Sequence, residues 1–250
     1  MNCKNCFKFG HTFYNCMKPI RSYGVILYRM ENDKKKYLMI CRKHTYGLSS
    51  IIRGKYASSN IEKIRTHVDG MTNKEKEMVM NESFENLWDY FWCGMLSNRQ
   101  NNEKVHSKLK FNTNRETIIE LIQNSKTNWE CAEWEFPKGR MQQNETEIEC
   151  ALREFEEETH ISKNNINLIY NLCPLEEFYT STNDKMYKIT YFLSQLKNEE
   201  PNLLSFQEEE VSKMEWKDLD ECLESIRPCN KEKKNLIRSL EEILNTYNVV

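Results

Sequence analysis

The sequence predicts a mixed α/β fold that is interrupted by a helical insertion and preceded by a small zinc-binding unit. Strand-like runs rich in Val, Ile, Tyr and Phe occur at 22–43 and return at 129–137 and 166–196. Between these runs, residues 60–125 carry apolar side chains at helical spacing. The first 16 residues are polar and hold three cysteines and one histidine. Because strands precede and follow the helices, we expect one domain with an insertion.

Length and composition agree with this plan. A chain of 250 residues with 39% hydrophobic residues can bury the core of one large domain that carries an insertion. No run approaches the roughly 20 apolar residues that span a bilayer, and the start "MNCKNCFKFG" lacks the apolar stretch of a secretory signal. We therefore expect a cytoplasmic protein without a membrane span, whose cysteines outside the zinc-binding unit are reduced thiols. The expected boundaries are 1–16 for the zinc-binding unit, 22–250 for the α/β domain and about 48–127 for the insertion.

Charge is distributed unevenly along the chain. Residues 1–65 hold 14 Lys and Arg against 3 Asp and Glu, whereas residues 66–250 have a net charge of −13. A basic segment of this size predicts contact with a polyanion such as RNA. The alternative is a solvated basic surface that has no partner.

The N-terminal unit has the spacing C-x2-C-x4-H-x4-C, formed by Cys3, Cys6, His11 and Cys16. Three thiolates and one imidazole complete a tetrahedral Zn²⁺ shell, so the zinc would be structural and would fold a segment too short to fold alone. The spacing resembles the zinc knuckle of retroviral nucleocapsid proteins, which implies binding of unpaired bases. The knuckle could instead dock on the protein's own body or on a partner. The candidate RNA-binding residues, here and in the basic stretch that follows, are Lys4, Phe7, Lys8, Phe13, Lys18, Arg21, Arg42, Lys43, Arg53 and Lys55.

The first strands and the insertion follow in order. "SYGVILYRM" and "KYLMICRK" predict two strands joined by the turn "ENDKK". In the insertion, Thr72 and Glu75 have the spacing of a capping box. "SFENLWDYFW" carries one apolar helical stripe whose tryptophans we expect in the core, and "NRETIIELIQNS" predicts another short helix. The sequence leaves open which aromatic residue would face a ligand. The candidates are Trp88, Trp92, Tyr56 and Tyr179.

After the insertion the strand pattern returns. "WECAEWEFP" predicts a strand, and a loop and a helix follow through Thr159. Further strands are expected at "INLIYNL" and "MYKITYFLSQL". The segments "KDLDECLESI" and "KKNLIRSLEEILNTY" predict the last two helices.

The helix through Thr159 carries a high concentration of negative charge. Glu154, Glu157 and Glu158 are related by i, i+3 and i+4, so their carboxylates share one face and repel one another. Mg²⁺ or Mn²⁺ would offset that repulsion, because these cations prefer oxygen ligands and can bridge phosphate oxygens. The alternative is a solvated charge run. Glu156 is expected to point elsewhere and to be solvated.

The spacing from Gly139 to Ile161 resembles the Nudix box, G-x5-E-x7-R-E-U-x-E-E-x-G-U, in which U is a bulky apolar residue. Every defined position matches except the last glycine, which is His160 in this chain. That glycine ends the helix in a left-handed conformation. Histidine tolerates this conformation better than β-branched residues do, so the departure concerns the helix end more than the metal site.

The resemblance to the Nudix family implies an α/β/α sandwich with a mixed sheet. It also implies hydrolysis of a nucleoside diphosphate that is linked to another moiety. Arg153 would orient the carboxylates, and Glu145 would support the junction of loop and helix or the outer metal shell. The implied ligands of Mg²⁺ or Mn²⁺ are Glu154, Glu157, Glu158 and the carbonyl of Gly139.

Two shorter segments narrow the resemblance. "EFPKGR" resembles the eukaryotic mRNA-decapping subgroup and the diadenosine-polyphosphate hydrolases, and Lys138 would place an ammonium near the bridging phosphates. "EEEVSKMEW" resembles a decapping motif whose acidic residue acts as general base or extra metal ligand, which implies that role for Glu210, with Glu209 as the alternative. An acidic loop without such a role is the other interpretation. The implied catalytic residues are Glu157, Glu154, Glu158, Glu210, Arg153 and Lys138.

The layout of hairpin, helical insertion and "WEFPKG" is similar to that of decapping Nudix proteins from large DNA viruses of the African swine fever virus and mimivirus type. The leading hypothesis is an mRNA-decapping pyrophosphatase that acts on capped mRNA and forms 7-methyl-GDP and 5′-monophosphate RNA. For a viral protein, the resemblance implies host shutoff in the host cytoplasm. One alternative is hydrolysis of diphosphoinositol polyphosphates or dinucleoside polyphosphates. Another is a non-catalytic RNA-binding protein, against which the complete set of box residues argues.

Overall fold

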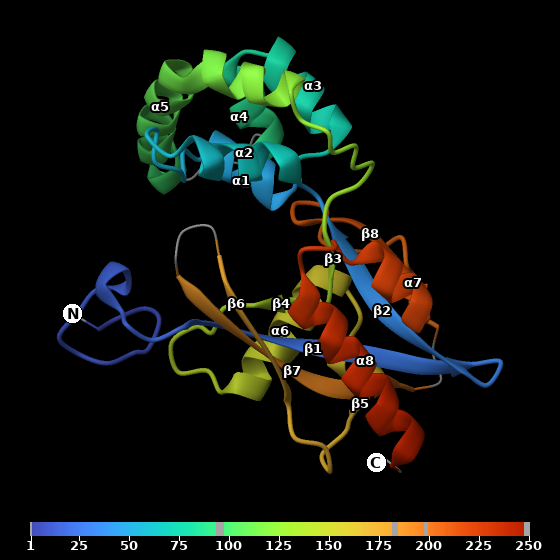
Figure 1. Cartoon of the computed structure of the whole chain (residues 1–250). Helices are drawn as coiled ribbons and strands as arrows, with labels where there is room; N and C mark the ends of the chain where they lie inside the picture. The colour runs from blue at the N-terminus through green and yellow to red at the C-terminus, as the bar shows by residue number, and fades with distance from the viewer. Residues whose placement is uncertain (1, 94–97, 182–184, 198–199, 248–250) are drawn as a thin grey trace. The chain divides into compact units, whose positions relative to one another are not determined.

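Two compact units make up the chain (Figure 1). The computed structural model describes residues 2–93, 98–181, 185–197 and 200–247. One unit combines Met1–Cys41 with Trp134–Val250 and contains the strands, and the other, Arg42–Glu133, is helical.

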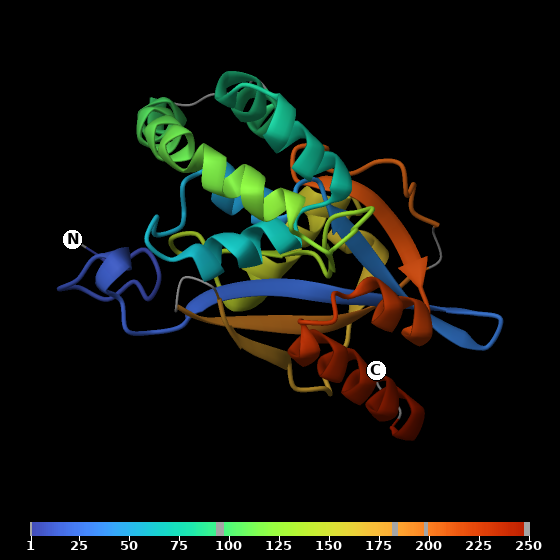
Figure 2. The ribbon, with the colours of Figure 1, turned by 45° about the horizontal axis from the view of Figure 1, so that its top comes forward.

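A mixed sheet of eight strands is the centre of the first unit. Its strands are β1 (Ile20–Glu31), β2 (Lys34–Arg42), β3 (Trp134–Glu135), β4 (Lys138–Gly139), β5 (Ile166–Leu168), β6 (Leu175–Thr180), β7 (Met186–Leu196) and β8 (Val211–Lys217). The order is β3-β2-β1-β7-β5, with β4 on β1, β6 on β7 and β8 on β2. β1 pairs in parallel with β7 and antiparallel with β2. It runs from the N-terminal Cys/His unit to the hairpin turn at the far end of the sheet (Figure 2).

The predicted hairpin is confirmed, and its turn is shorter than expected. Glu31 pairs with Lys34, so only Asn32 and Asp33 connect the strands. Their φ angles of 50° and 61° are the left-handed values that a two-residue hairpin turn of type I′ requires, and Asn and Asp tolerate them.

Five strands differ from the prediction, and for two of them, β4 and β8, no strand was expected. The strand expected at 129–137 shrinks to β3, because Trp129 belongs to the helical unit, where its Nε1 donates to the carbonyl of Asp69 at 2.9 Å. The strand expected at 166–172 is limited to β5. β6 has no counterpart in the prediction, because the two glutamates of "LEEFYT" obscure the alternation, although Glu177 is buried.

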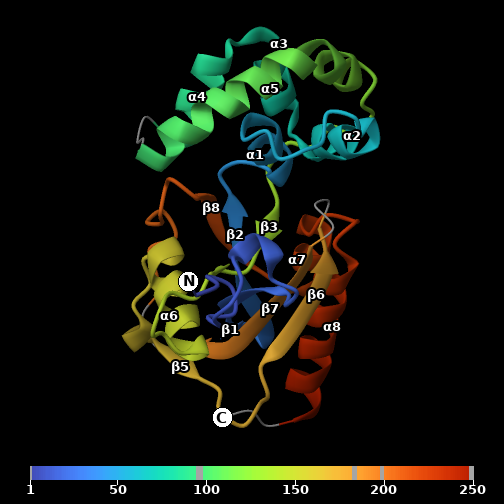
Figure 3. The same ribbon diagram turned by 90° about the vertical axis from the view of Figure 1, so that its left-hand side faces the viewer.

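Helices cover both faces of the sheet, which confirms the expected α/β/α sandwich (Figure 3). α6 (Glu147–Thr159) lies on one face, where Phe155 and Ala151 share a core with Val25 and Leu27 of β1. The other face is covered by α8 (Lys231–Thr246), and α7 (Leu219–Ser225) precedes it. The sheet therefore supports α6, which carries the acidic segment.

The helical unit has its own core. It consists of α1 (Tyr46–Ile52), α2 (Ile61–Gly70), α3 (Asn73–Asn81), α4 (Phe84–Trp92) and α5 (Asn98–Gln123). α1 was not predicted, and the short helix expected at 114–125 is the end of the longer α5. Within the described ranges, no helix is long and apolar enough to cross a membrane.

Two local predictions for this unit are confirmed. The Thr72 hydroxyl accepts a hydrogen bond from the Glu75 backbone N–H at 3.2 Å, and the Glu75 carboxylate accepts one from the Thr72 N–H, so α3 begins with a capping box. Trp88 is fully buried and lies 5.6 Å from the Phe84 ring, which makes it a core residue.

Candidate functional site

The limits of α6 are defined by its own residues. The Thr146 hydroxyl accepts a hydrogen bond from the Glu149 N–H at 3.3 Å, and the Glu149 carboxylate accepts one from the Thr146 N–H at 2.8 Å. The helix ends at His160, whose φ of 54° and ψ of 15° are left-handed. The structure thus confirms that histidine takes the conformation expected of the missing glycine. The His160 Nδ1 atom lies 3.0 Å from the Ser205 hydroxyl, a contact that the sequence does not reveal.

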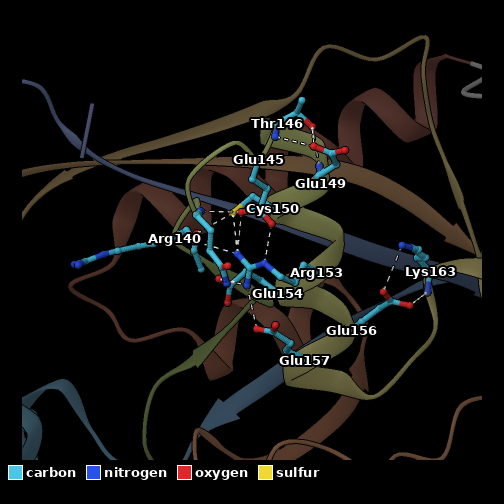
Figure 4. A network of polar contacts seen from close by, with 12 residues as sticks. Arg140, Glu145, Thr146, Glu149, Cys150, Arg153, Glu154, Glu156, Glu157 and Lys163 are labelled. Carbon is cyan, nitrogen blue, oxygen red and sulfur yellow. Dashed lines mark hydrogen bonds and ion pairs between the residues drawn. The ribbon is translucent and has the colours of Figure 1, made fainter. Parts of the chain in front are cut away.

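Arg153 is at the centre of the acidic cluster on α6 (Figure 4). Its Nε and Nη2 donate to the two carboxylate oxygens of Glu145 at 2.7 and 3.0 Å. Its Nη1 donates to Glu154 at 2.8 Å and to Glu157 at 3.0 Å. The bonds to Glu145 raise the pKa of Arg153, and Arg153 in turn holds the pKa of Glu145 below its ordinary value. One guanidinium therefore offsets the repulsion among three carboxylates.

Glu154 lies against Gly139 of the loop that precedes α6. A Cβ atom at Gly139 would overlap the carboxylate atoms of Glu154, so this close approach requires glycine. Burial raises the pKa of Glu154, and the charges of Glu157 and Glu210 add to that rise. The Gly139 carbonyl itself accepts a weak hydrogen bond from the Cys150 thiol at 3.8 Å.

Glu158 has different partners from the other two carboxylates. Its side chain is buried, and it accepts a hydrogen bond from the Lys138 backbone N–H at 2.8 Å. Burial raises the pKa of Glu158 to about 8. The Lys138 ammonium lies 2.7 Å from Glu135, a buried carboxylate that the sequence prediction missed. An acidic residue inside the apolar run "WEF" is the signal that could have identified it.

Glu156 does point away from this cluster, as expected. Its side chain is 33% exposed, and its carboxylate also accepts a hydrogen bond from the Lys163 N–H at 2.8 Å. This hydrogen bond attaches the segment that follows α6 to the helix (Figure 4).

The turn at 207–210 is attached to the end of α6. The Gln207 N–H donates to the Glu158 carbonyl at 3.3 Å, and the Gln207 carbonyl accepts from the Glu210 N–H at 3.1 Å. The charge of Glu210 contributes to the raised pKa of both Glu154 and Glu158. Glu209 lines a neighbouring pocket together with His160.

The donor set of this cluster suits a hard divalent cation. Glu154, Glu157 and Glu158 offer carboxylate oxygens, which Mg²⁺ and Mn²⁺ prefer over nitrogen or sulfur. The space beside Gly139 that a Cβ would fill is occupied by the Glu154 carboxylate. These residues therefore fit the metal that the Nudix resemblance implies.

The N-terminal ligands are also assembled. The ligand atoms of Cys3, Cys6, His11 and Cys16 all lie within 4.8 Å of one another, which fits the predicted zinc knuckle. Burial opposes ionisation of the Cys16 thiol, but hydrogen bonds from Asn5, the Lys18 backbone and His11 outweigh it and lower the pKa of Cys16 to about 6. Asn5 also donates its backbone N–H to the Cys3 sulfur at 3.4 Å. The hydrogen bonds to Cys16 favour its thiolate form, which is the form that binds a metal ion.

The candidate RNA-binding residues are divided between the two units. In the helical unit, the Arg53 Nε atom lies 2.7 Å from a carboxylate oxygen of Glu103, and the Arg53 guanidinium lies over the Trp92 ring. Arg42 lies over Tyr46, and Lys43 donates to the Cys93 sulfur at 3.2 Å. In the sheet-containing unit, Phe7 has a left-handed φ of 56°, and Arg21 lies 3.6 Å from Glu147. The exposed members of the set are Lys4, Lys8, Lys18 and Lys55.

The aromatic residues left open for ligand contact are distributed as follows. Trp88 and Tyr56 are buried in the helical core, and Trp92 packs on Trp88 at 5.9 Å. Tyr179 stacks on Tyr187 across β6 and β7, with ring centroids 5.2 Å apart.

Comparisons with known proteins agree with these features. The family model described as NUDIX domain matches residues 109–240. A protein named for mRNA decapping in Acanthamoeba polyphaga mimivirus is 26% identical, with 98% of this chain and 94% of that relative covered. The mRNA-decapping protein g5R of an African swine fever virus isolate is 28% identical, with 80% of this chain and 85% of that relative covered. An Ap4A hydrolase of C. elegans has a similar fold, with a TM-score of 0.50, 14% identity, and 91% and 98% of the two chains covered.

Proposed function

This chain belongs to the Nudix family, and from that premise we propose that it is a hydrolase that removes the cap of mRNA. The cluster that Arg153 organises on α6, next to the Lys138–Gly139 loop, is the observation that carries this proposal. Similarity to two viral proteins named for mRNA decapping supports capped mRNA as the substrate. The proposed products are 7-methyl-GDP and 5′-monophosphate RNA.

The proposed reaction is hydrolysis of the anhydride between the α and β phosphates of the cap bridge. Water attacks one phosphorus in line, its proton passes to Glu210, and the bridging oxygen leaves with the other phosphate. Arg153 keeps Glu154 and Glu157 oriented. Lys138, positioned by Glu135, would meet the negative charge that develops on the phosphates.

We propose that Glu154, Glu157, Glu158 and the Gly139 carbonyl hold Mg²⁺ or Mn²⁺. When bound, such a cation supplies neutralisation of phosphate charge and a more acidic water. The knuckle at 1–16 would hold a structural Zn²⁺ and present Lys4 and Lys8, together with the adjoining Lys18, to RNA phosphates. The α/β domain would span 22–250, with the insertion at about 48–127.

Gly139→Ala is expected to weaken Mn²⁺ binding by roughly 10- to 100-fold, because the new Cβ displaces the Glu154 carboxylate. A Mn²⁺ titration followed by electron paramagnetic resonance measures the effect. Gly70→Ala is the matched control, since its Cβ would lie 3.8 Å from the nearest atom, an ordinary contact. Equal affinities for the two variants would contradict the proposed role of Glu154.

Product analysis tests the proposed function. Purified protein with Mn²⁺ should release 7-methyl-GDP from RNA that is labelled in its cap. Diphosphoinositol polyphosphate and dinucleoside polyphosphate are offered at the same enzyme concentration. Much faster hydrolysis of either small substrate would replace decapping by the alternative activity. If no substrate is hydrolysed while Mn²⁺ binds, a non-catalytic RNA-binding role remains.

A further inference from the structure

The zinc knuckle is fastened to the first strand of the sheet. Asn5 is 8% exposed, and its side-chain amide donates to the carbonyls of Lys18 and Pro19 at 3.1 and 3.0 Å. Its Oδ1 accepts a hydrogen bond from the Arg21 N–H at 3.4 Å. The segment between the knuckle and β1, which the sequence presents as a linker, is therefore held by hydrogen bonds from Asn5 to two consecutive residues. The knuckle consequently has a defined place beside the start of β1.

A pocket of about 230 Å³ lies at this junction. Phe13, Pro19 and Met186 form apolar parts of its wall, and Lys18 and Lys185 supply positive charge. The residues that line the pocket include no aspartate or glutamate. Its volume is below the roughly 300–1,000 Å³ of sites for drug-sized ligands, so it suits one small group.

The Phe13 side of the pocket lies next to Arg140, the residue that follows β4. The Lys185 ammonium lies 5.1 Å and the Arg140 guanidinium 5.4 Å from the centre of the Phe13 ring. Arg140 follows Gly139 directly, and its carbonyl accepts a hydrogen bond from Arg153 at 3.1 Å. Figure 4 shows that the Arg140 side chain leaves the cluster of carboxylates while its backbone stays in contact with it. The pocket wall and the acidic cluster are therefore joined by a single residue.

We propose that this pocket binds one unpaired nucleotide of the RNA body, downstream of the cap. The base would lie against Phe13 and the apolar wall, and its phosphates would meet Lys18, Lys185 and Arg140. An acidic peptide would satisfy the cations but would leave the aromatic and methionine surface unused. The inference rests on the proposed function, because it assigns this nucleotide to the substrate of the α6 site. The knuckle then distinguishes capped RNA from small diphosphate substrates.

Binding of a fluorescent, uncapped single-stranded RNA tests the pocket. Phe13→Ala and Lys185→Ala should each weaken binding by roughly tenfold or more, measured by anisotropy. Lys185→Ala should also reduce the slope of log Kd against log salt by about 0.7, whereas Phe13→Ala should leave that slope unchanged. Lys34→Ala is the matched control, because Lys34 is an exposed lysine that begins β2 and pairs with Glu31 at the opposite end of β1. One zinc per chain in each variant shows that the knuckle is intact, and Phe13→Trp should restore binding.

Hydrolysis assays test whether the pocket contributes to the reaction. In Phe13→Ala and Lys185→Ala, kcat/KM should fall by roughly tenfold more on capped RNA than on the cap dinucleotide. RNA affinity like that of the control, or an equal loss on both substrates, would overturn the proposal, as would displacement of RNA by a polyglutamate peptide. If the wild-type protein binds RNA through the pocket but releases no 7-methyl-GDP, the proposed function fails and the binding site stands.

Discussion

Glu157→Gln should lower the release of 7-methyl-GDP from capped RNA by roughly two to three orders of magnitude, a loss typical of removing one preorganised electrostatic group. The substitution keeps the shape of the side chain and removes its charge. The Glu157 side chain is 50% exposed and its described contact is with Arg153 at 3.0 Å, so the free energy of unfolding should change by no more than about 1 kcal/mol. Single-turnover kinetics on cap-labelled RNA measures the loss.

Glu156→Gln is the matched control for this experiment. Glu156 precedes Glu157 on α6, but its carboxylate faces Lys163. The control removes the same charge from the same helix outside the proposed site, and it should retain wild-type turnover. Affinity for uncapped RNA should stay unchanged in Glu157→Gln, because this residue is proposed to bind metal rather than phosphate. Turnover within a few-fold of the wild type would refute a ligand role for Glu157.

Arg153→Ala should destabilise the protein and inactivate it. The carboxylates of Glu145 and Glu154 are only 13% and 17% exposed, and removing Arg153 leaves both without the cation that offsets their charge. The expected loss in the free energy of unfolding is roughly 2–3 kcal/mol, between the values for exposed and fully buried ion pairs. Urea unfolding at neutral pH, monitored by circular dichroism, measures it as a lower midpoint at an unchanged slope.

Lys163→Ala serves as the comparison for Arg153→Ala. Lys163 also pairs with a glutamate of α6, but its side chain is 57% exposed and lies 4.0 Å from Glu156. An exposed pair of this kind contributes less than about 1 kcal/mol. If the two variants unfold at the same urea concentration, Arg153 does not organise the acidic cluster as the structure indicates.

Much of the site could be predicted from sequence because its residues are local. The carboxylates, Arg153 and the left-handed His160 all lie on one helix or at its end, where spacing alone decides which side chains are neighbours. Glu135 and the His160–Ser205 contact could not be found this way, because residues distant in the chain form them. The spacing of the glutamates along the helix also did not reveal which of their carboxylates are buried. It is burial that separates Glu158, with its raised pKa, from the more exposed Glu157.

The sequence by itself determined the hairpin, the capping box of Thr72 and Glu75, the Cys/His cluster and the acidic helix, since each depends on residue types at short spacing. For the later strands, only the tertiary structure decided the limits, and it added β6. Pairing with β7 made a strand of "LEEFYT", and contacts in the helical unit withdrew Trp129 from the sheet. The place of the knuckle was also a tertiary outcome, because Asn5 reaches backbone groups 13 to 16 residues away. Hydrogen bonds of that range depend on the folded arrangement of the chain, which no local pattern records.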